Sequence, residues 1–245
     1  MFDFAPTVTS EIAPDVFRIC MYSRAIDLQF SFFLVKDEQP LLFTTGLRST
    51  FPALREAVSK LIDPAELRWI GFSHFESDEC GALNHWLGVA PSAQPVCSLV
   101  SAIVNVSDFA DRAPKGMQDG EVLSTGRHRF RFCSTAQLPH GWDAGVLFEE
   151  TRRTLLCSDL LHHDGDVEAL TERPLGDRIR AAMSKMQAGP LANYIPYTRR
   201  TGQIVSTLAD LNPQTLAIMH GSSFAGDGRR ELLAYADAMH DALGG

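Results

Sequence analysis

The first part of the chain carries short runs of apolar residues of the kind that form β-strands. The runs are rich in branched and aromatic residues and are broken by turn formers. They cover residues 16–23, 29–36 and 40–46. We therefore predict strands over most of the first 45 residues.

A helical pattern follows these strands over residues 49–64. Its apolar positions recur three or four residues apart, which is the spacing of one helix face. They are Phe51, Leu54, Val58 and Leu61. Ser49 or Thr50 is a suitable N-cap, and Pro64 is expected to end the helix.

The remainder of the chain repeats this order of strands followed by helices. Strands are predicted at 67–73, 94–100, 127–135, 144–150, 153–159 and 214–223. Helices are predicted at 81–89, at 175–211 with a break at Pro196, and at 229–243. Two similar halves in this order predict a layered α/β sandwich, with helices outside two sheets.

Composition narrows the classes of protein and partner. The hydrophobic fraction of 45% is ordinary for a globular protein, and the net charge of −8 argues against nucleic acid or an anionic membrane as partner. The five cysteines form no CxxC pair and suit a reducing compartment. We see no signal peptide and no apolar run long enough to span a membrane. We therefore expect a cytoplasmic protein.

A dense group of ionisable residues follows the predicted strand at 67–73. The stretch SHFESDECG places His74, Glu76, Asp78 and Glu79 within six positions. Such a group repels itself, more strongly when buried, unless a cation lies among its members. We therefore predict a metal site here.

Three more polar positions follow apolar runs farther along the chain. They are His140 in LPHGWD, Asp159 in LCSDL and His220 in IMHGSS. Loops at strand ends hold ligands well because a rigid sheet fixes them. With the first group, these give three imidazoles and four carboxylates, a set rich in oxygen that favours iron or manganese over zinc. Four carboxylates balance two Fe(II), although two zinc ions would be balanced equally.

These residues resemble the metallo-β-lactamase superfamily and, within it, the flavodiiron proteins. The superfamily motif is HxHxDH, followed by a distant His, an Asp and a final His; flavodiiron proteins have HxExDH. This chain has the residues 74–79 as HFESDE, then His140, Asp159 and His220 in the same order. Glu79 departs from the family pattern, and this version is similar to the stand-alone oxygen-binding diiron proteins.

The resemblance implies a two-metal site built from seven residues. His74, Glu76 and His140 would hold the first ion, and Asp78 and His220 the second. Asp159 would bridge both ions. For Glu79, binding the second ion, bonding a bound water and stabilising the next helix all stay open. No catalytic residue is assigned beyond these ligands, and no other cofactor-binding residue is assigned.

The resemblance also implies a fold and a function. The fold is a four-layer αββα metallo-β-lactamase sandwich, with residues 1–245 as a single domain and no flavodoxin-like domain or flavin in this chain. Two iron ions, with zinc or manganese as alternatives, would bind O₂ or NO. The protein would be a sensor or an oxidoreductase fed by a separate redox or signalling protein, and a homodimer. The alternative is a dinuclear zinc hydrolase acting on an ester, thioester or lactone, so whether the protein is an enzyme stays open.

Several further residues near the motifs are given roles from the sequence. Tyr194, Tyr197 and Trp142 either line the oxygen pocket or fill core; core is favoured for the two tyrosines, and Trp142 is left open. His162 and His163 are expected in a solvated loop, with a hydrogen bond to a ligand as the alternative.

Overall fold

Two seven-stranded sheets form the centre of residues 3–244, the part of the chain that the computed structural model describes. The first sheet contains, in spatial order, β1 (Val8–Ala13), β2 (Val16–Ser23), β3 (Leu28–Val35), β4 (Leu41–Phe43), β5 (Trp69–Gly71), β6 (Gln94–Ser98) and β7 (Lys115–Met117). The second contains β12 (Leu170–Thr171), β14 (Ser223–Ala225), β13 (Thr215–Ile218), β11 (Thr154–Ser158), β10 (Gly145–Glu149), β9 (Arg129–Ser134) and β8 (Val122–Ser124). The predicted domain of 1–245 also includes Met1, Phe2 and Gly245, which lie outside the described residues.

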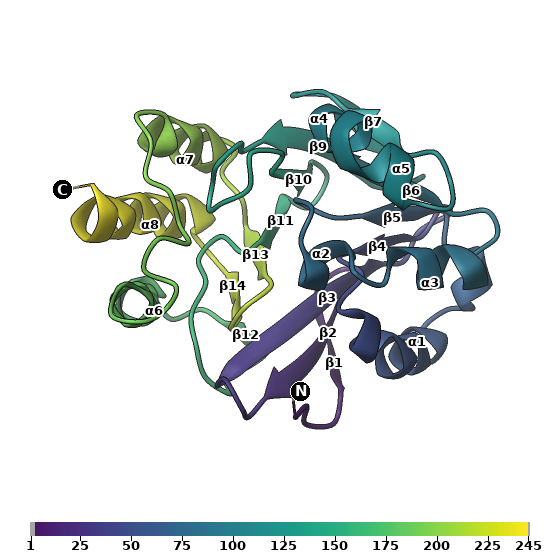
Figure 1. The fold of residues 1–245 in the computed structure, drawn as a ribbon, viewed down its shortest axis with the longest axis horizontal. Helices are drawn as coiled ribbons and strands as arrows, with labels where there is room; N and C mark the ends of the chain where they lie inside the picture. The colour runs from purple at the N-terminus through teal and green to yellow at the C-terminus, as the bar shows by residue number, and fades with distance from the viewer. Residues whose placement is uncertain (1–2, 245) are drawn as a thin grey trace.

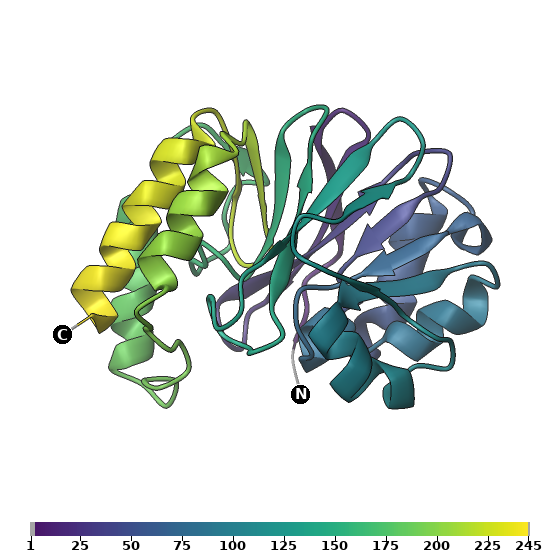
Figure 2. The ribbon, with the colours of Figure 1, turned by 90° about the horizontal axis from the view of Figure 1, so that it is seen from above.

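Helices cover the outer face of each sheet, so the molecule has four layers (Figures 1 and 2). The first half supplies η1 (Arg48–Thr50), α1 (Phe51–Ser59), η2 (Pro64–Glu66), α2 (Ser77–Cys80), α3 (Leu83–Val89), α4 (Leu99–Ser101), the π-helical η3 (Ala102–Val106) and α5 (Ser107–Phe109). The second half supplies α6 (Gly176–Gln187), α7 (Thr201–Asp210) and α8 (Gly228–Leu243). The predicted αββα sandwich is confirmed. None of the described helices is long and apolar enough to cross a bilayer.

Three apolar clusters fill the three interfaces between these layers. Strand β3 shows how one sequence serves two of them, because successive side chains of a strand point to opposite faces. Phe32 and Leu34 belong to the cluster beneath the first helical layer, whereas Phe33 and Val35 belong to the cluster between the sheets. The near-continuous hydrophobic run QFSFFLV is therefore a strand that is buried on both faces.

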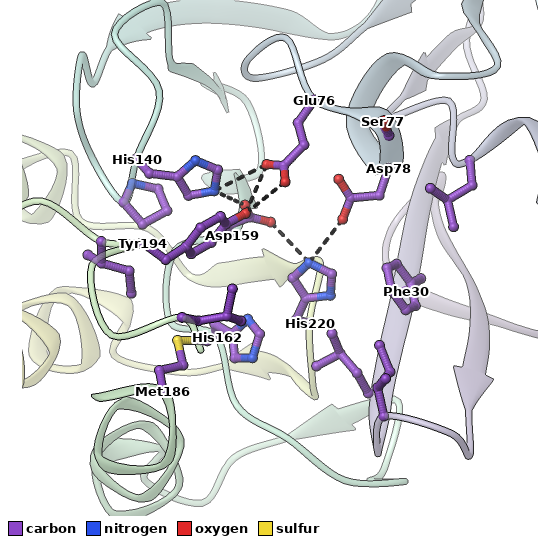
Figure 3. Close-up of a pocket in the computed structure, with 16 residues that line it drawn as sticks. Phe30, Glu76, Ser77, Asp78, His140, Asp159, His162, Met186, Tyr194 and His220 are labelled. Atoms are coloured by element: carbon purple, nitrogen blue, oxygen red, sulfur yellow. Dashed lines mark hydrogen bonds and ion pairs between the residues drawn. The ribbon is translucent and has the colours of Figure 1, made fainter. Parts of the chain in front are cut away.

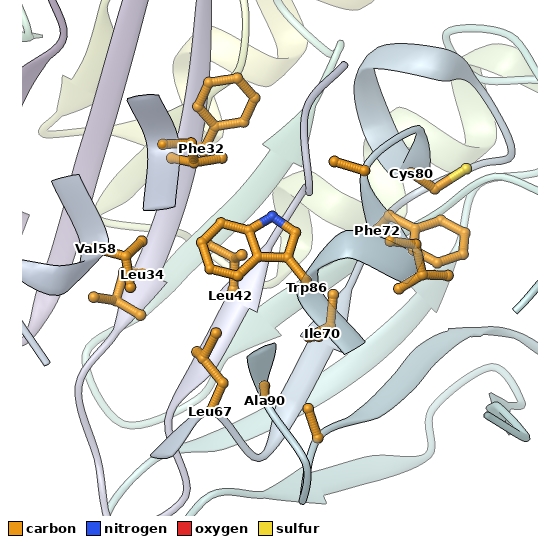
Figure 4. Packing of buried hydrophobic residues seen from close by; sticks show 14 of the residues in the cluster. Phe32, Leu34, Leu42, Val58, Leu67, Ile70, Phe72, Cys80, Trp86 and Ala90 are labelled. Atoms are coloured by element: carbon orange, nitrogen blue, oxygen red, sulfur yellow. The ribbon is translucent and has the colours of Figure 1, made fainter. Parts of the chain in front are cut away.

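The cluster under the first helical layer is centred on α3 (Figure 4). Trp86 of α3 is fully buried there, and its indole N–H donates to the carbonyl of Thr45 at 3.2 Å. A buried indole N–H needs such a partner. The helices α6, α7 and α8 pack on the second sheet in the same way, and Tyr235 of α8 is among the residues they bury.

The strand directions bring the candidate ligands to one edge of the sandwich. Strands β11 and β13 pair in parallel, so their carboxyl ends, followed by Asp159 and His220, lie together. Strand β5 of the first sheet leads into His74 and the short helix α2. His140 lies in the connection from β9 to β10.

Some local predictions were wrong in detail. The helix α1 ends at Ser59, and Pro64 instead begins η2. Thr50 occupies the N-cap position of α1, but its hydroxyl donates to the carbonyl of Leu47 and does not cap the helix. The predicted break at Pro196 is a longer non-helical segment, residues 188–200, between α6 and α7. The helical segment 99–109 was not predicted.

Candidate metal centre

Six of the seven predicted ligands lie together at one edge of the sandwich. We call His74, Glu76, Asp78, His140, Asp159 and His220 the site cluster. Figure 3 shows five of them converging on the middle of a cavity, with Asp159 between His140 and His220. They come from four separate connections, so the fold is needed to assemble them.

The first group within the site cluster is His74, Glu76, His140 and Asp159. Each offers one ligand atom, and these four atoms all lie within 4.8 Å of one another. Nε2 of His74 lies 2.9 Å from Oε2 of Glu76. Nε2 of His140 lies 2.9 Å from Oδ2 of Asp159 and 3.3 Å from Oε2 of Glu76. Two imidazoles and two carboxylates at this spacing are a suitable ligand set for one ion.

The second group shares Asp159 with the first. Nε2 of His220 lies 3.2 Å from Oδ1 of Asp159 and 3.5 Å from Oδ2 of Asp78. The two oxygens of Asp159 therefore face different groups, Oδ2 towards His140 and Oδ1 towards His220. This is the placement expected of a carboxylate that bridges two ions.

One buried atom at this junction has no hydrogen-bond partner among the described residues. Oδ1 of Asp159 faces Nε2 of His220 at 3.2 Å without the geometry of a hydrogen bond, although the residue is only 7% exposed. A buried carboxylate oxygen without a well-aligned donor is unfavourable. A cation beside Oδ1 would compensate the cost of burying this oxygen.

The electrostatics of the site cluster also reflect buried charges that face one another. Burial lowers the pKa of His74, but the carboxylates of Glu76, Glu79 and Asp159 outweigh it and raise that pKa to about 10. Burial likewise raises the pKa of Asp159, but the imidazoles of His140 and His220 hold it well below its usual range. Without metal, positively charged imidazolium groups compensate the carboxylates that metal ions would otherwise compensate.

The orientation of His220 leaves its Nε2 free to bind a metal. Its Nδ1–H donates to the main-chain carbonyl of Gln29 at 2.8 Å. This bond directs Nε2 towards Asp78 and Asp159, so Nε2 is the nitrogen that would bind a metal once its proton is released, the usual arrangement for a metal-binding imidazole. This orientation, the buried Asp159 oxygen and the grouped imidazoles and carboxylates together fit metal binding by the site cluster.

A glycine follows both His140 and His220, for a reason of space. Gly221 has φ of +112°, and a Cβ there would lie 2.4 Å from Nε2 of His163. Gly141 has φ of +82°, and its Cβ would lie 3.1 Å from the Cβ of His74. Both positions need a residue that tolerates the left-handed region and has no side chain. In the sequence, the HG pairs in LPHGWD and IMHGSS mark these two glycine positions.

Glu79, the seventh predicted ligand, does not join the site cluster. Its side chain is fully buried, with Oε2 accepting from the N–H of Ser73 at 2.9 Å and Oε1 accepting from the hydroxyl of Ser158. Burial raises the pKa of Glu79 to about 8, against the lowering effect of His74. We therefore correct its role: Glu79 holds Ser73 and Ser158, which precede His74 and Asp159.

Tyr194 is a site residue that the sequence did not predict. Its hydroxyl lies 2.9 Å from both carboxylate oxygens of Glu76, and its ring packs 4.1 Å from that of His140 (Figure 3). The expectation that it fills core was wrong. The sequence does not show that Tyr194 contacts Glu76 and His140, because the fold brings the segment 188–200 to the site.

The two neighbouring histidines are not in a solvated loop. His163 is fully buried, with its Nε2 accepting from the N–H of Ser222 at 2.8 Å. The ring of His162 packs 4.9 Å from that of His220. Trp142 is 47% exposed beside His140 and lies outside both the core and the main cavity.

A cavity of about 530 Å³ opens onto the site cluster. Besides the ligands, Ser77, His162 and Tyr194, its lining is apolar. The apolar lining residues are Ile26, Leu28, Phe30, Leu47, Pro139, Met186, Leu191 and Ile195. The candidate metal positions therefore face a largely apolar space.

Comparison with known protein families agrees with this arrangement. A family described as "ODP family beta lactamase" matches residues 28–221, most of the chain. The chain belongs to the ODP family. The resemblance predicted from the HxExD motif is thereby confirmed, and the matched residues of this ODP-family chain include the whole site cluster.

Individual relatives of the ODP-family chain are similar in sequence or in fold. It is 26% identical over 203 residues to a rubredoxin-oxygen oxidoreductase of Megalodesulfovibrio gigas, a match covering 80% of this chain and 49% of that protein. The chain thus spans about half the length of this relative.

Solved structures match over nearly the whole chain. A rubredoxin oxygen:oxidoreductase of Desulfovibrio gigas has a TM-score of 0.78 at 19% identity, covering 94% of this chain and 61% of that one. A flavo-diiron protein mutant of Thermotoga maritima has a TM-score of 0.80 at 19% identity, covering 96% and 62%. At this identity the two matches establish the shared fold.

Proposed function

We propose that the site cluster holds two iron ions. His74, Glu76 and His140 bind the first ion, Asp78 and His220 bind the second, and Asp159 bridges them. The observation that carries the proposal is the division of Asp159, whose Oδ2 lies 2.9 Å from Nε2 of His140 and whose Oδ1 lies 3.2 Å from Nε2 of His220. A bridging carboxylate is the arrangement that suits a pair of ions.

The donor set supports iron over zinc. Three carboxylates and three imidazoles offer many hard oxygen donors, whereas zinc sites are typically richer in His and Cys. Glu76 stands where the zinc hydrolases of the superfamily have a histidine. The alternative of a zinc hydrolase is therefore not favoured, and manganese remains the nearest substitute for iron.

The ligand of this centre is a small uncharged molecule, O₂ or NO. Ferrous iron, when bound, supplies the electrons that bind or reduce such a molecule. Apolar side chains such as Phe30, Leu47 and Met186 line the approach, exclude bulk water and admit an apolar diatomic. Tyr194 holds the carboxylate of Glu76 in place through its hydroxyl.

The protein works with a separate redox or signalling partner. A cavity of about 530 Å³ is much larger than a diatomic molecule requires, so it leaves room for a group that another protein brings to the site. The relative named rubredoxin-oxygen oxidoreductase supports a role with an electron donor. This arrangement suits either a sensor or a reductase that receives its electrons from a partner protein.

The domain organisation, the cellular compartment and the oligomeric state are proposed from the sequence. Residues 1–245 form one domain, which the continuous four-layer core supports. The free cysteines support a reducing cytoplasm. The homodimer rests on the resemblance to flavodiiron proteins.

The test is a titration of the iron-loaded, fully reduced protein with O₂ and separately with NO, followed by absorption spectroscopy. A spectral change complete at about one O₂ per chain, or one to two NO per chain, supports the proposal. Continued O₂ consumption with an added chemical reductant identifies a reductase, whereas a stable adduct identifies a sensor. An iron-loaded protein whose spectrum neither gas changes would contradict the proposed function.

A further inference from the structure

Arg18 is a buried charged residue that the proposed metal chemistry does not use. It lies within β2, in the hydrophobic stretch VFRICMYS, and is only 2% exposed. Placing a guanidinium in a protein interior is strongly unfavourable unless it is paired and hydrogen-bonded. The contacts of Arg18 therefore indicate why it is there.

The guanidinium joins the first sheet to the loops that carry the site cluster. Its Nη2 donates to the carbonyl of Gly221 at 2.9 Å and to Oε1 of Gln29 at 2.9 Å. The amide Nε2 of Gln29 donates in turn to Oδ1 of Asp166 at 3.2 Å and to the carbonyl of Val167 at 2.9 Å. Strands β2 and β3 are thereby bonded to the loops after β11 and β13.

The same part of β3 orients His220. The main-chain carbonyl of Gln29 accepts from Nδ1 of His220 at 2.8 Å. The N–H of Ser31 donates to the carbonyl of Met219 at 2.9 Å. The ring of Phe30 packs edge-to-face against His220 at 5.1 Å. The position of Gln29 therefore sets the direction of the His220 ring.

The main chain and the ring of His163 hold the other side of this loop. The N–H of His163 donates to the carbonyl of His220 at 3.0 Å, and its Nε2 accepts from the N–H of Ser222 at 2.8 Å. Arg18 binds the carbonyl of Gly221 through its side chain and from the first sheet. A substitution of Arg18 therefore removes the anchor without changing the sequence of the loop.

We propose that Arg18, acting through Gln29 and Gly221, is a positioning residue for the second metal ion. It fixes the loop so that Nε2 of His220 faces Asp78 and Asp159. The inference rests on the proposed metal site. Among the described contacts of Arg18, none involves His74, Glu76 or His140, so its loss weakens the second ion and spares the first.

The test is calorimetric titration of Fe²⁺ into metal-free protein without oxygen, comparing the wild type with Arg18→Met. The wild type is expected to bind two ions in two steps. In the variant, binding of the second ion weakens about 10- to 100-fold, the usual effect of losing a residue that orients a metal ligand. Arg18→Lys restores part of the affinity, because one ammonium group reaches a single acceptor.

Arg112→Met is the matched control. Arg112 is also a partly buried arginine that donates to main-chain carbonyls, including Ala90 at 3.2 Å and Leu87 at 3.4 Å, but it lies in the first helical layer. Its loss lowers the melting temperature and leaves both binding steps intact. If Arg18→Met does not fold, Gln29→Leu replaces it, since that variant keeps the main-chain carbonyl that binds His220.

The outcomes are distinct. Selective weakening of the second step supports the inference. Two unchanged steps, or equal weakening of both, overturn it and leave the metal site standing. A wild type that binds fewer than two ions overturns the proposed metal site itself.

Discussion

Two clusters of histidine and carboxylate side chains lie at opposite ends of the same strands. The site cluster lies where β10 begins, after His140, and the second lies where β3 and β10 end. We call the second the distal cluster; its members are Asp15, Asp37, His128 and Glu149. The residue types are alike, but the carboxylates are compensated in different ways.

Main-chain N–H groups stabilise two of the distal carboxylates, Asp37 and Glu149, and the guanidinium of Arg127 pairs with Asp37 and Asp15. Asp37 accepts from the N–H groups of Glu38, Arg127 and His128 and from the hydroxyl of Thr125. Burial raises its pKa, but these donors hold it well below its usual range. Glu149 likewise accepts from two main-chain N–H groups, those of Thr151 and Arg152.

Among the residues that the structure describes, main-chain N–H groups do not supply the carboxylates of the site cluster in this way. Glu76 receives the hydroxyl of Tyr194, and Oδ1 of Asp159 has no hydrogen bond among the described residues. Its carboxylates face imidazole nitrogens instead. The comparison shows that residue types alone do not define a metal site, because satisfied carboxylates need no ion and unsatisfied ones do.

The largest expected effect is on metal content. The comparison is between two variants, each of which replaces the central carboxylate of one cluster with an uncharged amide. Asp159→Asn should lose both ions, with affinity falling by more than about 100-fold, because the bridge serves both. Asp37→Asn should keep both ions and lose stability only. Metal analysis of both variants after gel filtration measures the difference, and equal metal content in the two would break the distinction between the clusters.

Metal removal should destabilise the wild type strongly. Ions present at about 1,000 times their dissociation constant stabilise a protein by about 4 kcal/mol. For a chain of this size, that corresponds to about 10 °C in melting temperature. Calorimetric melting with and without a chelator measures it, and Asp159→Asn should show no chelator effect. A wild-type melting temperature that chelation leaves unchanged is incompatible with this account.

Glu79 tests whether a carboxylate of the HFESDE motif can have a structural role and bind no metal. Glu79→Gln should retain both ions, because Glu79 bonds Ser73 and Ser158 and no described ligand group. The unfolding free energy should fall by about 1–3 kcal/mol, because the amide of Gln keeps only one acceptor oxygen for two buried donors. Denaturant unfolding and metal analysis check the two parts. Loss of one ion would restore Glu79 as a ligand.

The smallest expected effect is the pH dependence of the distal cluster. The hydrogen bond to Glu149 raises the pKa of His128, and burial opposes it; the charges of Asp37 and Asp15 raise it further. The contribution of His128 to stability is thus complete below its unfolded pKa of about 6.5 and is lost as pH rises through the folded value.

Comparing wild type with His128→Gln measures this contribution. The difference in unfolding free energy should be about 1–2 kcal/mol near pH 6 and should shrink towards pH 9. Metal content should be the same in both proteins. A difference that grows with pH would show that neutral His128 is the stabilising form.

The sequence predicted the layers better than the contacts. Repeated apolar runs led to the two sheets, and the motif HFESDE with His140, Asp159 and His220 led to the site cluster, because spacing and residue type are local. Tyr194 and Arg18 were missed because their roles depend on segments brought together by packing. The role of Glu79 stayed open because only the structure shows that its oxygens accept from Ser73 and Ser158.

The most direct measurement is elemental analysis of iron, zinc and manganese per chain in wild-type protein purified without oxygen from iron-supplied cells. The account predicts about two irons per chain and little zinc. About two zincs per chain would contradict it and support the hydrolase, and a metal content near zero would contradict a metal site altogether.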